Sequence, residues 1–350
     1  MNDKTRVEFA DQAQLTPGEN RVVDPILTNV SRDYRNAEHI WPILFPIVPV
    51  AQRGGKIIEF KADDFRKYST VRAPGGGRQR VLFGHGSRNY NCVQRALDGQ
   101  VPREQMEEAM AVPAINYGMR AMNKTMNIIS LQIEVEAAAL ATDADNYDAS
   151  NKKALAGNDR WDNDASHPNK LVEDAKDQIR MKIAMLPNAL VIGYSVYKAL
   201  KNHKGILDRL RYVEGLSESG MPSVTLGKLA SYFDVDQVVV GQAMTGEAGD
   251  FDDLWGKTAV LAYTNIGSGE MGTPTYGYTY RVNGYPVAEP GWFDRACDSW
   301  IYPVTTEDTS AIVGQDAGFC LPQSCDEAAL AHAPAHGWAG LRRGRPHRYR

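Results

Sequence analysis

The longest amphipathic stretch of the chain runs from Pro113 to Thr142. Its apolar residues recur at steps of three and four, which places them on one face of a helix: Ile115, Met119, Met122, Met126, Ile129, Ile133, Ala137 and Leu140. The polar residues fall largely off this face, and they include Asn116, Arg120, Lys124, Glu134 and Glu136. Pro113 suits the first turn, because the N–H that proline lacks would have no partner there. At about 1.5 Å per residue, the predicted helix is about 45 Å long.

This helix alone does not decide the fold. A coiled-coil arm or a member of a helix bundle is an alternative, although no charge pattern at the flanking heptad positions favours a coiled coil. The segments on either side of the helix are therefore needed to predict the fold.

The residues before the long helix predict an arm and a long hairpin. A short helix near 25–30 is the only regular element that the pattern predicts within residues 1–50. The run Trp41–Pro46 is expected to be extended, because proline disfavours helix interiors and central strands. An extended apolar arm needs a surface to cover it, and a second copy of the chain can provide that surface. Lys56–Phe60 and Arg80–Phe83 then predict the two strands of a hairpin.

The segment between these strands is charged and far longer than the about 2 to 5 residues of typical hairpin loops. We therefore predict that it reaches out to a neighbouring subunit through Lys61, Asp63, Asp64, Arg66, Lys67, Arg72, Arg78 and Arg80. The glycines 75–77 raise the alternative of a phosphate-binding loop. A loop tip is favoured, because no Lys-Ser/Thr pair follows Gly77 and the next predicted element is a strand. Cys92–Leu97 is expected to be a polar connector, and Arg103–Ala111 a short helix.

After Thr142 the chain becomes acidic and rich in turn residues up to Asp164, which marks a domain boundary or a surface loop. The triplet 162–164 is similar to the start of a calcium loop, but the glycine and the distal glutamate of that motif are absent, so a solvated loop is favoured. Helices and strands then alternate, which predicts a mixed α/β domain: a helix from Leu171 to Leu186 that Pro187 ends, strands Ala189–Gly193, Gln237–Gly241 and Thr258–Tyr263, and helices Ser195–Asn202 and Thr225–Phe233.

The first strand of this domain is not followed by GxGxxG, so a Rossmann dinucleotide site is excluded. Beyond it, Thr275–Val282 alternates as a strand does, and Asn283-Gly284 predicts a hairpin turn into a returning strand from Tyr285. Trp300–Val304 predicts a further strand, and we expect these late strands to pack back along the long helix.

Composition and charge limit the classes of protein to which the chain can belong. The chain has 350 residues, of which 43% are hydrophobic and 23% charged, with a formal net charge of -4, so charge gives no general argument for binding to nucleic acids or membranes. The N-terminal residues lack the apolar core of a signal peptide, and prolines interrupt the longest apolar run. The four cysteines form no CxxC pair, which argues for reduced thiols. We expect a soluble protein made in a cytoplasm.

The sequence contains no convincing catalytic motif. The seven histidines are scattered without a Cys or Asp at catalytic spacing, and His203 is expected to complement the dipole at the end of a helix. Gly193–Tyr197 fails the GxSxG pattern at its last position. We therefore predict no catalytic residue, no cofactor and no metal site.

The order of the predicted parts resembles the major capsid proteins of tailed bacteriophages, which have the HK97-like fold. The local matches are Arg160-Trp161-Asp162 before the helix from Leu171; Pro187–Gly193 followed by Val196, Ala199, Leu200, His203 and Ile206; Val224–Leu226, Leu229-Ala230, Phe233–Val235 and Val238–Gly241; and Trp255-Gly256 before the strand that ends at Tyr263. The resemblance covers roughly residues 20–319 and depends on the ordered set, since no single motif is diagnostic.

This resemblance implies an α+β HK97-like capsid fold with a long spine helix and an extended β-hairpin loop. The implied parts are an N-terminal arm (1–50), the extended loop (51–98), the spine helix of the peripheral domain (99–142), a mixed α/β axial domain (143–264), the returning strands of the peripheral domain and chain end (265–319), and an atypical basic tail (320–350). Copies would form pentamers and hexamers that close into an icosahedral head shell around double-stranded DNA.

The implied partners are other copies of the chain, scaffolding, portal and decoration proteins, and packaged DNA bound without sequence preference. No membrane and no enzymatic activity are implied, and the protein would be part of the virion after assembly in the host cytoplasm. Two alternatives stay open, a cytoplasmic α/β enzyme of unknown reaction and a phage tail-tube or adaptor module. Particle size discriminates among them, because an enzyme would form a small oligomer and a tail module filaments or rings.

The last residues depart from the family, which usually closes on a short apolar segment after a Gly-aromatic step such as Gly318-Phe319. Residues 341–350 contain five arginines and no acid. Such a tail either binds DNA phosphates or forms a solvated extension unrelated to the shell, and the extension is favoured because basic tails are common.

Overall fold

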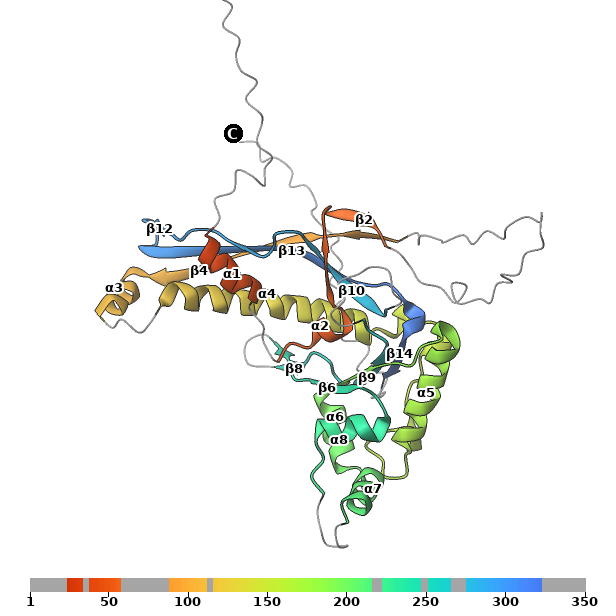
Figure 1. The fold of residues 1–350 in the computed structure, drawn as a ribbon. Coiled ribbons are helices and arrows are strands. Elements are labelled where there is room, and N and C mark those ends of the chain that lie inside the picture. Colours follow the sequence, from red (N-terminus) through yellow and green to blue (C-terminus); the bar gives the residue numbers. More distant parts are fainter. Residues whose placement is uncertain are drawn as a thin grey trace, which may run out of the picture.

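The long helix α4 (Tyr117–Thr142) supports the rest of the molecule in the computed structural model. The structure describes residues 24–33, 38–57, 88–111, 116–215, 222–246, 251–265 and 275–322. A six-stranded sheet lies along one side of α4, and a lobe built on a four-stranded sheet lies at the C-terminal end of the helix (Figure 1). The described residues therefore form the predicted α+β arrangement.

Helix α4 begins at Tyr117 and not in the region of Pro113. Asn116 caps it, because the Asn116 side-chain oxygen accepts a hydrogen bond from the Met119 N–H at 3.0 Å. Residues 112–115, Ile115 among them, lie outside the described residues. Of the other predicted stripe positions, Met119 is half-buried, and the following are buried: Met122, Met126, Ile129 and Ile133. Glu134 was expected on the polar face, and this expectation is wrong, because its side chain is fully buried.

The six-stranded sheet is organised around β13 (Ser299–Ile312). Strand β4 (Val93–Pro102) pairs antiparallel along one edge of β13. The other edge pairs in turn with β10 (Gly277–Val282), β11 (Val287–Ala288) and β12 (Trp292–Asp294), and β1 (Ile47–Val50) adds to β10 in parallel. Helix α4 packs against β4 and β13. A Cβ at Gly118 would lie 2.8 Å from the Tyr302 ring, so this glycine lets the helix approach β13 closely.

The predicted hairpin at Asn283-Gly284 is wrong. A turn is present, since Gly284 has a φ of 91°, but the strands before and after it do not pair with each other. Both β10 and β11 pair with the same edge of β13. The turn lies between these two strands and does not join two strands of a hairpin. The chain reverses later, between β12 and β13, where Asp298 has a φ of 47°.

Two further expectations before the long helix are corrected. Trp41–Leu44 is the short helix α2, because Pro42 occupies its first turn, where proline is tolerated, and Ile47–Val50 is a paired strand. The segment from Val93 to Leu97 belongs to β4 and is no connector. The helix near residue 25 is α1 (Pro25–Asp33), and α3 (Arg103–Ala111) has the predicted bounds.

The hairpin of the extended loop is described only at its base. There β2 (Gly54–Lys56) pairs antiparallel with β3 (Asn89–Asn91), and the Ile57 N–H donates to the Arg88 carbonyl at 2.9 Å. The remaining part of the predicted pairing, including Arg80–Phe83, lies outside the described residues. Lys56 itself pairs with Asn89.

The lobe contains the sheet β14-β9-β5-β6. Strand β5 (Ala189–Gly193) is buried throughout and pairs with β6 (Gln237–Gly241) in parallel and β9 (Thr258–Ala262) in antiparallel orientation. Helices α5 (Pro168–Ile183), α6 (Tyr194–Asn202), α7 (Lys204–Glu214) and α8 (Leu226–Phe233) lie on the side of this sheet away from α4 (Figure 1). Because the sheet is covered on both faces, its strands are continuous apolar runs.

Three predictions in this lobe need correction. Helix α5 ends at Ile183, where Ala184 adopts a left-handed conformation, so Pro187 does not end it and Leu186 is 53% exposed. Helix α7 was missed. Strand β14 (Gly318–Pro322) pairs with β9, so the buried Cys320 and Leu321 belong to the sheet and not to the basic tail.

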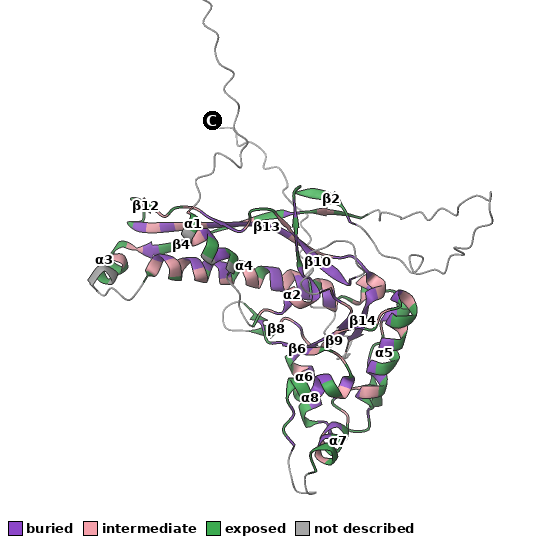
Figure 2. Ribbon diagram, in the orientation of Figure 1, coloured by how far each residue is buried: buried purple, intermediate pink, exposed green. Residues whose placement is uncertain are grey.

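The acidic segment after α4 folds into three short 3-10 turns, Ala144–Asn146, Ala149–Asn151 and Gly157–Asp159, and a fourth, Gln315–Ala317, precedes β14. A small ribbon of β7 (Met244–Thr245) and β8 (Asp252–Asp253) follows β6. Figure 2 shows buried residues gathered where α2, β10, β14 and the end of α4 meet. The core therefore continues from the six-stranded sheet into the lobe. Among the described helices, none is long and apolar enough to cross a membrane.

Candidate functional site

The predicted contact residues of the extended loop all lie outside the described residues, namely Lys61, Asp63, Asp64, Arg66, Lys67, Arg72, Arg78 and Arg80. The base from which the loop leaves the sheet is described. It is fixed to β13 by Arg53, whose guanidinium makes two hydrogen bonds of 2.9 Å to the carboxylate of Glu307. The Tyr285 hydroxyl donates to the same carboxylate at 3.1 Å.

A balanced group of charges lies beside this anchor, on β4, β10 and β13. Asp308 is buried and accepts hydrogen bonds from Arg95, from Arg281 at 3.2 Å and from the Thr306 hydroxyl at 3.0 Å. Arg95 also pairs with Glu136 of α4. Arg53, Arg95 and Arg281 together balance Glu136, Glu307 and Asp308, so no net charge is left uncompensated. This cluster joins the loop base, the sheet and the long helix.

The same surroundings affect a nearby thiol. Burial raises the pKa of Cys92 to about 11, and the carboxylates of Asp308 and Glu307 act in the same direction. Cys320 in β14 is also buried, and its pKa is raised to about 12, chiefly by burial. Both thiols are therefore mostly protonated near neutral pH, and the thiol is a much weaker nucleophile than the thiolate. Cys297 is exposed, and Cys325 lies outside the described residues.

The arm is held on α4 by polar contacts one helical turn apart. A ring nitrogen of His39 lies 2.7 Å from the Ser130 hydroxyl, and the Trp41 backbone N–H donates to Glu134 Oε2 at 2.8 Å. Trp41, Leu44 and Phe45 are buried. The arm segment that follows α1 is therefore part of the core, and it is not an uncovered extension.

The buried carboxylate of Glu134 also reaches the lobe. Its Oε1 accepts a hydrogen bond from the Trp255 indole N–H at 2.6 Å. Burial raises the pKa of Glu134, against the hydrogen bonds from Trp255, Trp41 and Ile40, which favour the ionised form. Glu134 thus links the arm, the long helix and the lobe through one side chain. Sequence reasoning missed it, because spacing by threes and fours marks only a narrow stripe, whereas α4 is buried over a wider arc.

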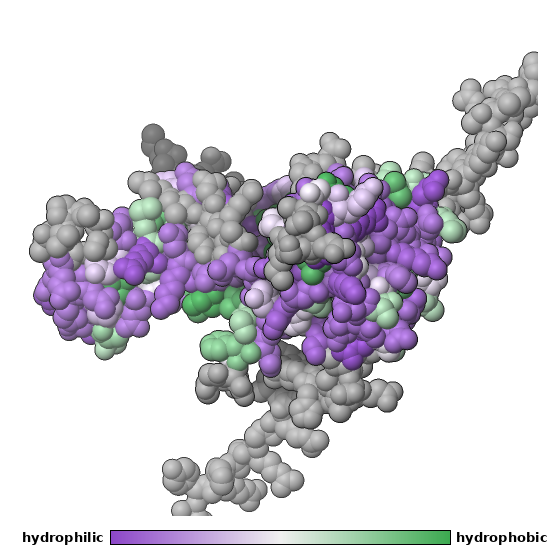
Figure 3. Space-filling model, turned by 90° about the horizontal axis from the view of Figure 1, so that it is seen from below, coloured by the Kyte–Doolittle hydropathy of each residue, from purple (hydrophilic) through white to green (hydrophobic). Residues whose placement is uncertain are grey.

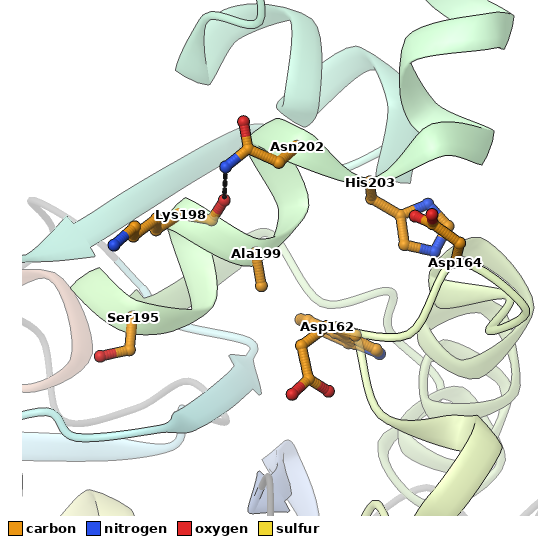
Figure 4. Close-up of a pocket in the computed structure, with 8 residues that line it drawn as sticks. Asp162, Asp164, Ser195, Lys198, Ala199, Asn202 and His203 are labelled. Atoms are coloured by element: carbon orange, nitrogen blue, oxygen red, sulfur yellow. Dashed lines mark hydrogen bonds between the residues drawn. The ribbon is translucent and has the colours of Figure 1, made fainter.

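A hollow of about 340 Å³ lies on the lobe between α6 and the loop around Trp161 (Figure 4). Ser195 and His203 line it from opposite ends of α6, about 12 Å apart along the helix axis. Ser195 donates to Asp253 at 3.3 Å, whereas His203 Nε2 lies 3.1 Å from the Ser166 hydroxyl and 3.2 Å from the Asn163 carbonyl. The histidine is too far away to activate the serine.

His203 lies at the C-terminal end of α6, where the sequence predicts it, and it is a buried side chain at the junction of α6 and α7. Among the residues that the structure describes, no three or more His, Cys, Asp or Glu side chains are grouped as a metal ion would require. The described residues of the face in Figure 3 are mostly hydrophilic, with small separate hydrophobic areas. The geometry favours structural contacts over catalysis.

Comparison with known proteins identifies the class. No model of a known protein family matches the chain. The chain is 34% identical to the major capsid protein of Burkholderia phage BcepMu over 308 residues, which cover 86% of this chain and 96% of that protein. The chain belongs to the family of phage major capsid proteins. The major capsid protein of Pseudomonas phage JBD67 is 27% identical over 280 residues, which cover 77% of this chain and 86% of that protein.

Solved structures agree with this capsid family. A crystal structure of a phage-related protein from Bordetella bronchiseptica RB50 is 37% identical, with a TM-score of 0.73, and the match covers 86% of this chain and 97% of that chain. The capsid structure of cyanophage P-SCSP1u is 12% identical, with a TM-score of 0.51 and coverage of 90% and 94%, and it supports the fold alone. The capsid protein described here has the HK97-like fold.

Proposed function

We propose that the chain is the structural subunit of a phage head. Copies assemble into pentamers and hexamers, and these close into an icosahedral shell around double-stranded DNA. The observation that carries the proposal is the match to a phage major capsid protein over 96% of that protein's length. Assembly takes place in the host cytoplasm, and the product is part of the virion. Scaffolding, portal and decoration proteins are proposed as further partners.

The architecture supports this role. The hairpin base is fixed to β13 through Arg53 and Glu307, so force on the loop is transmitted to the sheet and to α4. Closed shells require contacts between different surfaces of identical subunits, and the predicted extended loop would provide one such surface. The separated Ser195 and His203 and the protonated thiols of Cys92 and Cys320 give no support to an enzyme. We infer a non-enzymatic protein.

We propose the domain division given by the family, with two adjusted boundaries. The extended loop ends near Asn91, because Val93–Pro102 pair along β13 in the peripheral domain. The axial domain includes Gly318–Pro322, because these residues complete its sheet. The arm, the spine helix and the returning strands keep their assigned positions.

Light scattering and sedimentation of the purified protein test the proposal. Particles of capsid size or ring-shaped capsomers are expected, either alone or with a phage scaffolding protein. A small oligomer under every assembly condition is the result of the rival enzyme hypothesis and would overturn the proposal.

Deleting Asp64–Gly77 is expected to abolish assembly and leave a folded subunit. A single exposed ion pair contributes only about 0 to 1 kcal/mol, but a shell repeats each contact many times. Circular dichroism and sedimentation of the deletion variant measure folding and assembly separately. Normal shells from this variant would show that the loop does not make the essential contact.

Truncation after Pro322 is the matched control for that deletion. It also removes chain, but it keeps β14 and its pairing with β9. Shells of unchanged size and DNA content are expected, because we regard the basic tail as a solvated extension. Loss of packaged DNA in the truncated protein would instead make the tail a DNA-binding part.

A further inference from the structure

Glu134 is shared by three parts of the subunit that are distant in sequence. Trp41 at the start of α2 donates its backbone N–H to one carboxylate oxygen at 2.8 Å. Trp255 in the lobe donates its indole N–H to the other oxygen at 2.6 Å. Glu134 itself lies in the second half of the spine helix α4. The two oxygens of one carboxylate therefore accept hydrogen bonds from the arm and from the lobe.

Trp255 is packed so closely against the four-stranded sheet of the lobe that it cannot move independently of that sheet. Gly193 and Gly241 pair in register at the ends of β5 and β6. A Cβ at Gly193 would lie 2.0 Å from the Gly256 carbonyl oxygen, and a Cβ at Gly241 would lie 2.1 Å from the Trp255 ring. The two glycines form a slot that holds the Trp255 segment against the sheet. The position of the indole N–H therefore follows the orientation of the lobe.

The arm segment is seated equally closely on the other side. Helix α2 contacts α4, β10 and β5. Phe45 lies directly after it and packs on Gly277, where a Cβ would be 2.4 Å from the Phe45 ring. The segment Ile40–Phe45 thus packs between α4, strand β10 of the six-stranded sheet and strand β5 of the four-stranded sheet. Movement of the arm would remove the N–H of Trp41 from Glu134.

The two contacts depend on each other, because the carboxylate is buried. A buried carboxylate needs its hydrogen-bond donors to offset the loss of water, so removal of one donor weakens the arrangement that holds the other. Such a dependence is reciprocal: if the lobe affects the arm, the arm affects the lobe to the same extent.

We propose that Glu134 couples the seating of the arm to the orientation of the axial lobe. A neighbouring copy that binds or pulls the arm thereby changes the angle at which the lobe enters a ring of subunits. This inference depends on the proposed function for the identity of the neighbour. The coupling itself is a property of the single subunit and can be measured without assembly.

The chain contains a matched pair of tryptophans for the test. Trp255 and Trp161 are both buried in the lobe, at 1% and 0% exposure. The Trp161 indole stacks on Phe233 at 6.2 Å, and its N–H has no hydrogen-bond partner. Trp255→Phe and Trp161→Phe delete the same atoms, but only the first removes a donor to Glu134.

Amide hydrogen exchange of unassembled subunits measures the coupling. In Trp255→Phe, exchange in Ile40–Phe45 is expected to be at least about tenfold faster than in the wild type, whereas Trp161→Phe leaves it unchanged. Equal exchange of Ile40–Phe45 in the two variants would overturn the coupling. Absence of shells from the wild-type protein would overturn the proposed function and leave this result intact.

Ser130→Ala provides the reciprocal measurement and a second variant if Trp255→Phe does not fold. Ser130 contacts His39 and Trp41 of the arm, and the hydrogen bond of Trp255 goes to Glu134 and not to Ser130. Loosening of the arm is expected to speed exchange of the Trp255 indole N–H, observed by NMR. If the indole N–H keeps its wild-type exchange rate while the amides of Ile40–Phe45 exchange faster, the contacts of the arm and of Trp255 with Glu134 are independent of each other.

Discussion

Asp308→Ala is expected to destabilise the subunit by about 3 to 5 kcal/mol, because it removes a buried carboxylate from the ion-pair cluster. The carboxylate is buried on β13 and accepts hydrogen bonds from Arg95 and Arg281. Without it, the largely buried guanidinium groups of Arg95 and Arg281 both lose a carboxylate partner. Guanidinium denaturation of unassembled subunits measures the loss of folding free energy.

The control is Asp162→Ala. Asp162 pairs with Arg160 at 2.7 Å, but the two side chains are 50% and 36% exposed, so a change of only about 0 to 1 kcal/mol is expected. Similar losses in the two variants would show that burial of Asp308 does not determine its contribution. They would also remove the argument that this cluster anchors the loop base.

Gly193→Ala is expected to cost about 3 kcal/mol or more, at the upper end of what overpacking of a core costs. The backbone of Gly193 has a φ of -66°, which alanine adopts freely, so the cost is purely steric. The new Cβ would lie 2.0 Å from the Gly256 carbonyl oxygen and 3.0 Å from that of Trp255. Relief of the clash has to displace the backbone of the segment that carries Trp255.

Gly227→Ala in α8 is the matched substitution with the opposite expected sign. No atom lies within 4 Å of a Cβ at this position, and alanine favours a helix over glycine by up to about 1 kcal/mol. Thermal denaturation of both variants is a direct comparison. A Gly193→Ala protein as stable as the wild type would show that the lobe is free to move away from the spine at this point.

Local patterns predicted several elements with the bounds that the structure shows. Ala189–Gly193 and Gln237–Gly241 are observed as strands with the predicted bounds, because β5 and β6 lie within a sheet that has helices on both faces. Helix α3 was likewise predicted with the correct bounds. The long helix was predicted to its last residue, but its first turn was not, because the cap at Asn116 overrides the proline signal.

Features that depend on distant partners were not predicted. The N–H donors of Glu134 come from residues 93 and 121 positions away in sequence. Asn283-Gly284 is correctly a turn, but whether its flanking strands pair with each other is decided by β13. Pro42 in the sequence argues against a helix, although its position in the first turn of α2 makes it compatible with one. Each error concerns a choice that tertiary contacts make.

The proposed function requires copies of this chain to close into a shell. This can be tested by electron cryo-microscopy of particles assembled from the purified protein, with a phage scaffolding protein where assembly requires one. Closed icosahedral shells are expected, with rings of five subunits on the fivefold axes and rings of six between them. Helical tubes, or small oligomers alone under every condition, would contradict it.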